Sequence, residues 1–519
     1  MKIFAKIIIV FTTISAAIME LIDTSIVNVA LLNIAGNLGA TIEDASWVIT
    51  AYAIANVIII PMTGFLAQYF GRKNYYLYSI VLFTIASVLC GNSSSLWELV
   101  FWRFVQGIGG GALLSTSQSI LFDSFEVKQR GIASAMFGIG IVMGPTLGPV
   151  VGGIIIDHYA WPLIFNINIP FGILAVTLTY CFVEDSVHHT TKPSIDWIGI
   201  MLLAAGVGSG QYVLERGDAN DWFADRSIQI FGAITVLSVI GFIFWELNED
   251  EPVVNVRLFK DPNLTLTTLL TFVSGFALFT SVFVYPQLLQ RVLGYTPTMV
   301  GMSLMPSALA SILVMPIVGK RLQAGDSPKI FITIGFILIM IYGWMLYRLT
   351  NMNATMDDFF LPLMVRTAGI SMMAVTLTNQ AVVGLSPRDI PQGVALNNMM
   401  RQLGGAFGIA LMNTYISNRF AVHRTDLLTN ITADSANFIE RNLALLQGVG
   451  SKLAVTANAQ QQAYQIMDLT VSKQAYLLTY ADAFLFSTMA VLAVFPMIFG
   501  LRNKKLTAEE MKIASESAH

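Results

Sequence analysis

The chain has 519 residues, of which 55% are hydrophobic and 12% are charged, and its formal net charge is −3. Soluble globular proteins carry roughly 25% charged residues, so this composition excludes an ordinary soluble protein. The apolar residues fall into stretches of about twenty, the length of helix that crosses a hydrocarbon core of about 30 Å. The sequence therefore predicts a protein that crosses a membrane many times.

Fourteen apolar stretches, taken in chain order, predict membrane-spanning helices, because a helix satisfies its own backbone hydrogen bonds within a bilayer. The first six lie near residues 6–30, 45–69, 75–92, 97–121, 131–156 and 163–183. Two more lie near 196–214 and 228–246, and the last six near 264–286, 297–318, 329–349, 359–383, 394–418 and 476–500. The predicted fold class is an all-α polytopic membrane protein with about 14 transmembrane helices.

A faint internal repeat organises this series. Arg103 and Gly107 in the fourth stretch resemble Arg366 and Gly369 in the twelfth, and glycines of the fifth are echoed in the thirteenth. Such repeats are typical of transporters that bind substrate between two halves. We expect two six-helix pseudo-repeat bundles, residues 1–190 and 261–519, joined by two linker helices and a cytoplasmic loop at 191–260. A long polar outer loop, 419–475, has helical signals of its own, for example at 437–446, and either carries function or only caps the last two spans.

The distribution of lysine and arginine predicts the orientation, because cytoplasmic loops collect these residues. One side carries Lys2, Lys6, Arg72, Lys73, Lys128, Arg130, Lys192, Arg257, Lys260, Lys320, Arg321, Lys329, Arg388, Arg502, Lys504 and Lys505. The short loops of the other side carry only Arg216, Arg226, Arg291 and Arg348. We therefore expect both termini to be cytoplasmic.

Two carboxylates, Glu20 and Asp23, lie one turn apart in the first apolar stretch. A charge at the middle of a membrane costs about 2.5–3.5 kcal/mol, so each needs a reason to be there. At positions i and i+3 they share a helix face, where mutual repulsion and low dielectric favour a bound proton. Both are candidates for proton coupling, Asp23 foremost. The alternative is a local cap or ion pair near the outer surface.

Arg103 lies within the fourth stretch and cannot be neutralised, so it needs an anionic or carbonyl partner. We expect Asp23 to pair with Arg103 when ionised and to release it when protonated, which makes Arg103 part of the coupling site. A purely structural ion pair is the alternative. Further polar candidates for the substrate cavity and its gates are Asn28, Gln106, Arg366 and Arg401. The two later arginines could instead lie at a membrane boundary and reach the interface.

The fifth stretch combines glycines with prolines at helical spacing. Its glycines are Gly140, Gly144, Gly148 and Gly152, and Pro145 and Pro149 lie beside them. Glycines four residues apart form a bare stripe that lets a neighbouring helix approach, and each proline removes a backbone hydrogen bond. Helix packing is a sufficient explanation of this pattern. The alternative is that the stripe seals the protein against proton leak. Under that alternative the gating candidates are Gly144, Pro145, Gly148 and Pro149.

Motifs of other protein classes are missing from the sequence. The glycines of 107–111 lie inside an apolar stretch without a strand–loop–helix context, so they do not indicate a nucleotide site. The sequence has no P-loop, no H-E-x-x-H, no G-x-S-x-G and no metal-ligand spacing. We expect no enzyme, no metal and no cofactor; the driving force would be the proton gradient.

Several motifs together resemble the major facilitator superfamily. The loop after the second stretch, 64–73, resembles the family's loop signature, although Gln68 replaces the usual acidic residue. Arg103-x-x-Gln106-Gly107 resembles the fourth-helix signature, and the glycine–proline run of 140–153 resembles the fifth-helix signature of antiporters. The resemblance implies a cytoplasmic gating loop formed by Gly64, Gly71, Arg72 and Lys73.

Within that family, the run 23–30 (DTSIVNVA) resembles the first-helix signature of the fourteen-helix drug:proton antiporters of the EmrB/QacA type. Three further stretches look like that branch: 47–50, 165–170 and 401–405. The resemblance implies proton-coupled multidrug efflux of small amphipathic compounds across the cell inner membrane, by alternating access. It also implies a periplasmic adaptor protein and an outer-membrane channel as partners, and no nucleic acid. A narrow-specificity exporter of a metabolite, siderophore or lipid-like molecule is the alternative.

Overall fold

The computed structural model describes residues 3–125, 129–184, 194–386, 389–429, 431, 436–450 and 456–501. In these residues the chain is all helical, without a β-strand. Seven of the basic residues used to predict the orientation lie outside the described ranges: Lys2, Lys128, Lys192, Arg388, Arg502, Lys504 and Lys505.

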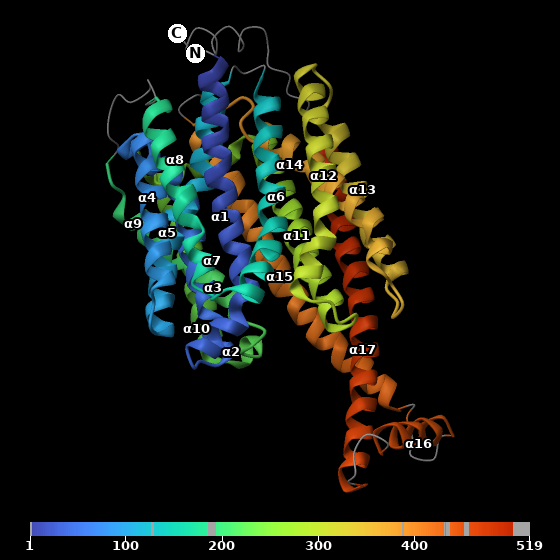
Figure 1. Cartoon of the computed structure of the whole chain (residues 1–519). Helices are drawn as coiled ribbons and strands as arrows, with labels where there is room; N and C mark the ends of the chain where they lie inside the picture. Colours follow the sequence, from blue (N-terminus) through green and yellow to red (C-terminus); the bar gives the residue numbers. More distant parts are fainter. Residues whose placement is uncertain are drawn as a thin grey trace.

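Long helices run up and down one elongated bundle (Figure 1). Those before residue 250 are α1 (Ile3–Asn37), α3 (Trp47–Phe70), α4 (Arg72–Gly91), α5 (Leu96–Ser124), α6 (Arg130–His158), α8 (Asn168–Phe182), α9 (Trp197–Arg216) and α10 (Arg226–Asn248). The later ones are α11 (Pro262–Arg291), α12 (Pro297–Gln323), α13 (Pro328–Leu349), α14 (Phe360–Gln380), α15 (Ile390–Thr429) and α17 (Thr456–Val494). Shorter elements are α2 (Ile42–Ala45), α7 (Leu163–Asn166), η2 (Trp222–Ala224), η3 (Val256–Lys260), η4 (Met356–Phe359), α16 (Ala436–Gly450) and η5 (Phe495–Gly500).

Twelve helices of the described chain have the length and apolar composition needed to cross a membrane. The two long helices outside that set are α5 and α15, with 29 and 40 residues. Both carry many polar residues and glycines on surfaces that pack against other helices: residues 115–119 of α5 are all buried, and α15 has buried residues up to Ile416. Length and composition therefore support twelve spans, two fewer than the sequence predicts.

The two ends of the bundle differ (Figure 1). We call the end where α1 begins and η5 ends the terminal end, and the end that carries α16 the distal end. At the distal end α15 and α17 run on beyond the other helices, with α16 beside them. A 40-residue helix is about 60 Å long, about twice the thickness of a hydrocarbon core.

Most of the polar segment 419–475 is helical: it comprises the end of α15, all of α16 and the first half of α17. The two long helices hold each other through side chains. Phe420 stacks on Tyr476 with ring centroids 4.1 Å apart, Arg424 Nη2 lies 2.7 Å from Asp468 Oδ1, and Arg419 pairs with Asp482. Periodic hydropathy could not find these pairs because they join residues more than forty positions apart.

Helix packing follows the same pattern at both ends of the sequence. In the first part α1 packs on α6, α5 and α8, and in the last part α11 packs on α15, α14 and α17. Contacts of α6 with α12 and of α3 with α15 join the two parts. Near the terminal end the bare Cα atoms of Gly131 and Gly319 face each other's carbonyl groups.

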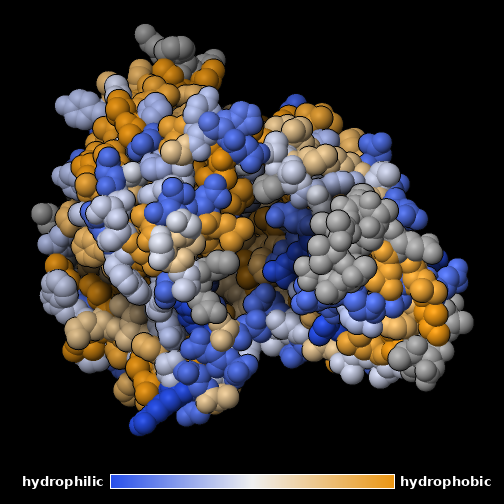
Figure 2. Space-filling model, turned by 60° about the horizontal axis from the view of Figure 1, so that its bottom comes forward, coloured by the Kyte–Doolittle hydropathy of each residue, from blue (hydrophilic) through white to orange (hydrophobic). Residues whose placement is uncertain are grey.

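The space between the two parts is closed at the terminal end and hollow at the distal end. Near the terminal end, Leu121 and Phe122 of α5 form one buried cluster with Val382, Ile390 and Val394. Figure 2, which brings the distal end forward, shows a hollow between two masses with hydrophilic residues along it.

Candidate functional site

A buried ion pair joins α1 to α5. Arg103 Nη1 donates a hydrogen bond of 2.6 Å to Asp23 Oδ2, and both side chains are excluded from solvent. Arg103 also donates to the backbone carbonyl of Val48, at 3.2 Å, and its guanidinium lies 4.1 Å from the centre of the Tyr52 ring. The sequence predicted this partner for Arg103, and the structure places the two residues in contact.

The other oxygen of Asp23 is bonded as well. Oδ1 accepts hydrogen bonds from Gln106 Nε2 at 3.0 Å and from Asn168 Nδ2 at 2.7 Å. Both amides also donate to Ser87 Oγ, at 2.6 and 3.2 Å. Two helices, α5 and α8, thus supply donors to both oxygens of Asp23, and Ser87 of α4 holds the two amides in place. Charge-assisted hydrogen bonds are stronger than neutral ones.

Glu20, one turn earlier on α1, has a different environment. Its Oε1 accepts hydrogen bonds from Asn56 Nδ2 at 3.1 Å and from Tyr52 Oη at 3.3 Å. The side chain is 2% exposed, and its Oε2 has no hydrogen-bond partner in the described part of the chain. An ionised carboxylate buried in this way loses solvation without full compensation. A bound proton would remove the charge.

Arg401, a buried residue of α15, is a cation that acts on Glu20. The two interact electrostatically, although their atoms are not within salt-bridge distance. Arg401 Nη2 donates 2.5 Å to Asn398 Oδ1, and Asn398 Nδ2 donates to Ser115 Oγ and Gln118 Oε1 of α5, at 3.0 and 3.2 Å. This chain of hydrogen bonds connects residues 283 positions apart. It therefore ties α15 to α5 close to the acidic face of α1.

The remaining polar candidates lie elsewhere. Arg366 on α14 is buried with its guanidinium carbon 5.9 Å from the centre of the Tyr342 ring, and no salt bridge to it occurs within the described ranges. It therefore does not reproduce the Arg103 pair in the later helices. Asn28 is exposed on α1, where its Nδ2 donates 3.4 Å to the carbonyl of Thr24.

The glycine stripe of α6 faces α1. A Cβ on Gly148 would lie 2.8 Å from Ser25 Cβ, and one on Gly152 would lie 2.8 Å from Ile26 Cγ1. Gly140 and Gly144 face the same helix, while Pro145 and Pro149 lie inside α6. The stripe is thus a helix-packing surface that sets how close α6 comes to the helix carrying Glu20 and Asp23.

The loop at 64–73 lies at the terminal end. A Cβ on Gly64 would lie 2.7 Å from Gln392 Cγ of α15, and Gly71 has a positive φ of 85°, which favours glycine. Arg72 forms a salt bridge with Asp123 of α5, and Lys73 Nζ donates 2.9 Å to the carbonyl of Tyr180. Asp123 supplies the acidic partner that the sequence lacks at Gln68.

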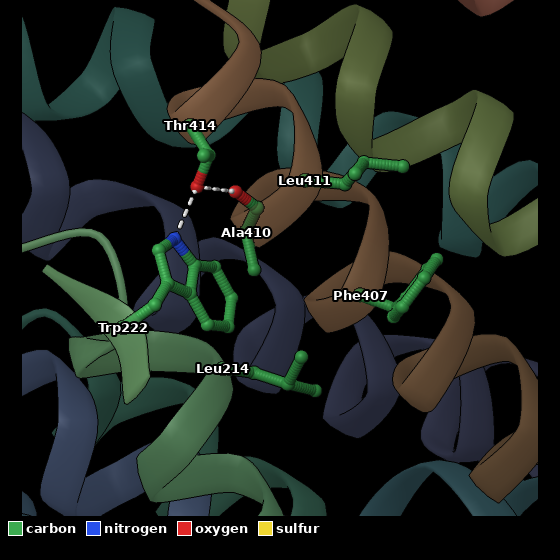
Figure 3. A pocket seen from close by; sticks show the side chains of 6 residues that line it. All are labelled: Leu214, Trp222, Phe407, Ala410, Leu411 and Thr414. Carbon is green, nitrogen blue, oxygen red and sulfur yellow. Dashed lines mark hydrogen bonds between the residues drawn. The ribbon is translucent and has the colours of Figure 1, made fainter. Parts of the chain in front are cut away.

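A small apolar cavity lies where the α9–α10 hairpin meets α15. It has a volume of about 290 Å³ and is lined by Leu214, Trp222, Phe407, Ala410, Leu411 and Thr414 (Figure 3). Trp222 Nε1 donates 2.8 Å to Thr414 Oγ1, and Asn413 Nδ2 donates 2.7 Å to Asp218 Oδ2. These contacts hold the distal turn of the hairpin against α15.

Several members of this network carry no recognisable signal in the sequence. Tyr52, Asn56, Ser87, Gln118 and Asn398 are common residue types in apolar helices and carry no spacing signal. The one usable signal is a glycine-rich helix face: helices approach most closely there, so polar residues on such faces are candidates for contacts between helices. Groups of three or more His, Cys, Asp or Glu side chains able to hold a metal ion are absent from the residues that the structure describes.

A polytopic helical bundle of two packed parts, with charged side chains buried inside it, is the architecture of a membrane transporter. The family model of the Major Facilitator Superfamily matches residues 13–409. The chain is 32% identical over 488 residues to the multidrug export protein EmrB of Escherichia coli K12, covering 94% of this chain and 92% of that protein. It is 36% identical over 416 residues to EmrB of Haemophilus influenzae, covering 80% of this chain and 81% of that protein.

The fold agrees with these matches. The proton:xylose symporter XylE, a solved structure of that superfamily, superimposes with a TM-score of 0.61 at 13% identity and covers 98% of both chains. The chain belongs to the major facilitator superfamily and is a multi-pass membrane protein.

Proposed function

We propose that this protein exports small amphipathic compounds, with multidrug breadth, in exchange for protons. Two multidrug export proteins match this chain over most of their length, with 32 and 36% identity. The observation that carries proton coupling is Glu20: a buried carboxyl that is hydrogen-bonded to α3 through one oxygen, while the other has no partner among the described residues. A narrow-specificity exporter is not favoured, because both of these relatives are named multidrug export proteins. We assign the chain no catalytic activity and no cofactor.

In our proposal all fourteen long helices cross the inner membrane, α5 and α15 included. Residues 1–190 and 261–519 form the two six-helix bundles, and α9 with α10, within 191–260, forms the linker pair. The packing of α1 on α6 and of α11 on α15 supports this repeat. The excess of lysine and arginine near the terminal end supports cytoplasmic termini. The distal hollow then opens to the outside.

The transport cycle would alternate access to a cavity between the bundles. The contacts of α3 with α15 and of α6 with α12 would separate at the terminal end while the distal hollow closes. Protonation of Glu20 removes its attraction to Arg401, which weakens one link between the bundles. Each proton that enters gains about 2.3 kcal/mol per 100 mV of membrane potential. One or two protons per substrate therefore suffice for useful accumulation.

Asp23 and Arg103 have a supporting role in this mechanism. Because Asp23 is fully hydrogen-bonded as an anion, we propose that it fixes Arg103 and the adjoining Tyr52, and so positions the partners of Glu20. The substrate would contact Asn28 and the side chains that line the hollow. Gln106, Arg366 and the glycine–proline stripe of α6 would shape the cavity and its gates rather than carry protons.

The helical extension formed by α15, α16 and α17 is the proposed docking site for a periplasmic adaptor protein, which would connect to an outer-membrane channel. Its projection beyond the bundle supports this assignment (Figure 1). Deleting α16 while closing the gap with a short Gly/Ser linker should abolish co-purification with the adaptor and leave detergent-solubilised protein monodisperse. Retained adaptor binding would refute the assignment.

The test of the proposed function is substrate-dependent proton movement in reconstituted liposomes. With a pH-sensitive dye inside and a pH gradient imposed, wild type should release protons when a lipophilic cation is added. Glu20→Gln should bind the same compound but move no protons, and Glu440→Gln, a change of an exposed carboxyl on α16, should behave as wild type. Proton release by Glu20→Gln at the wild-type rate would remove Glu20 from the mechanism.

A further inference from the structure

A second pair of buried carboxyl groups lies far from the central site, at the terminal end of the α9–α10 hairpin. Asp196 is the N-cap of α9, and Glu246 belongs to the last turn of α10. Glu246 is 0% exposed and Asp196 is 7% exposed. Charged side chains are almost never buried to this degree unless they are paired. The transport mechanism proposed above uses neither of them.

Both carboxyl groups face the same bare glycine. A Cβ built on Gly199 would lie 2.7 Å from Glu246 Oε1, and it would also collide with Asp196 Oδ2. These two oxygens therefore occupy adjoining space against one side of Gly199. Only a residue without a side chain leaves room for both, which explains the glycine at the third position of this helix.

Hydrogen-bond donors are distributed unequally over the pair. Asp196 Oδ1 accepts from the backbone N–H of Gly199 at 2.8 Å and from Trp245 Nε1 at 3.0 Å, so this side of Asp196 is satisfied as an anion. Asp196 Oδ2 and both oxygens of Glu246 have no hydrogen-bond partner among the described residues. The backbone N–H of Val254 faces Glu246 without standard hydrogen-bond geometry.

The surrounding charges do not neutralise the pair. Besides Asp196, the charged groups that act on Glu246 are Glu249, from the end of the same helix, and Arg257, from η3. Arg257 Nη2 donates to the carbonyls of Leu247 and Glu249, at 3.0 and 2.8 Å, and forms no salt bridge with Glu246. Two ionised carboxylates at this site would repel each other in a low dielectric.

We propose that Asp196 and Glu246 form a proton-binding site, in which Glu246 is protonated and donates a hydrogen bond to Asp196 Oδ2. One proton then satisfies two oxygens and removes one of the two buried charges. The inference does not depend on the proposed transport function, because it concerns a separate pair of residues and its first tests need no substrate.

The position of the pair gives the proton a structural effect. Val253 and Val254, which follow α10, are buried in a cluster with Phe65 of α3 and Leu396 of α15. The backbone N–H of Asn255 donates 3.2 Å to Gln392 Oε1, and Gln392 packs on Gly64. Loss of the proton would push α9 and α10 apart and disturb this segment. Gain or loss of the proton by Asp196 and Glu246 would thus alter the packing of α3 against α15.

Infrared spectroscopy of the full-length protein provides the first test. At about pH 8 ordinary carboxyl groups are ionised, so a carbonyl band of a protonated carboxyl identifies the site. In a Glu20→Gln background, which removes the other candidate, we expect one such band, and we expect Glu246→Gln to abolish it. If the band is absent, or if it survives Glu246→Gln, the proposal is wrong.

Thermal unfolding against pH provides a second, independent readout. The folded state would hold a proton that the unfolded chain releases, so stability must fall as pH rises. We expect the melting temperature of wild type to fall by several degrees between about pH 6 and about pH 9, and at least half of this fall to vanish in both Glu246→Gln and Asp196→Asn.

Asp225→Asn is the matched control, because Asp225 is the N-cap of the partner helix α10 and carries no acidic neighbour in its cap contacts. It should keep the wild-type pH dependence. A metal cation would give another result: if sodium at fixed pH raises the melting temperature of wild type but not that of Glu246→Gln, the site holds a metal ion and the shared proton is refuted.

Discussion

Asp23 and Arg103, eighty residues apart in sequence, form a fully buried ion pair whose Oδ2 to Nη1 distance is 2.6 Å. Every oxygen of Asp23 has a donor, whereas Glu20, one turn away, has an Oε2 without a hydrogen-bond partner among the described residues. The two carboxyl groups of one helix face therefore differ in their hydrogen-bonding surroundings, and our proposal gives them different roles.

Removing one member of the Asp23–Arg103 pair should destabilise the protein. Arg103→Met leaves a buried carboxylate without its cation, which typically costs about 3–5 kcal/mol. We expect a large drop in the melting temperature of detergent-solubilised protein. The double variant Asp23→Asn/Arg103→Met should recover part of the loss, because no buried charge remains. A double variant as unstable as the sum of the two single ones would show that the pair is not coupled.

Changing Glu20 should affect coupling more than folding. Glu20→Gln keeps the shape of the side chain and can still hydrogen-bond to Tyr52 and Asn56, so we expect its stability to change by less than about 1 kcal/mol. We expect binding of a lipophilic cation to wild type, measured by fluorescence quenching, to depend on pH, and we expect Glu20→Gln to lose that dependence. Asp23→Asn, in contrast, should lower stability. The reverse ranking of the two variants would make Asp23 the proton carrier.

Gly107 tests how tightly the helices around the site are packed. A Cβ there would lie 2.6 Å from the carbonyl oxygen of Tyr52 and 2.8 Å from Ala55 Cβ, so Gly107→Ala must push α5 away from α3. We expect a loss of about 1–3 kcal/mol. Gly36 is also helical, but a Cβ added there would meet nothing within 4 Å; Gly36→Ala should be neutral or gain up to about 1 kcal/mol. Equal effects of the two substitutions in thermal unfolding would contradict the packing.

The contact of Gly64 with Gln392 permits a test of alternating access. A Cβ on Gly64 would lie 3.0 Å from the Cα of Gln392, which is within reach of a disulfide, whose Cβ atoms are about 3.5–4.5 Å apart. In a Cys181→Ser background, Gly64→Cys/Gln392→Cys should cross-link on mild oxidation and stop export, and reduction should restore it. Each single cysteine variant should export before and after oxidation. Export by the cross-linked protein would exclude opening at this contact.

Much of the fold is visible in the sequence because membrane spanning is a local property. A stretch of about twenty apolar residues predicts a spanning helix wherever it occurs, and twelve such helices are found in the described residues. The helices α5 and α15 were predicted as spans from the sequence, but they fall outside those twelve because their buried parts carry polar residues and glycine. The segment 419–475 is polar and mostly helical, and its helices hold each other through side-chain contacts.

The sequence by itself determined that charges lie within the membrane, and that Arg103 needs an acidic partner, because an unpaired buried charge is too costly to keep. Only the tertiary structure decided what each charge does. Asn168 donates a hydrogen bond to Asp23, and Ser87 accepts one from the neighbouring Gln106. Asn398 links Arg401 to α5 by hydrogen bonds, and the bare Gly199 leaves room for Asp196 beside Glu246. Whether a carboxyl holds a proton depends on donors that other helices supply, and no local pattern records which helices become neighbours.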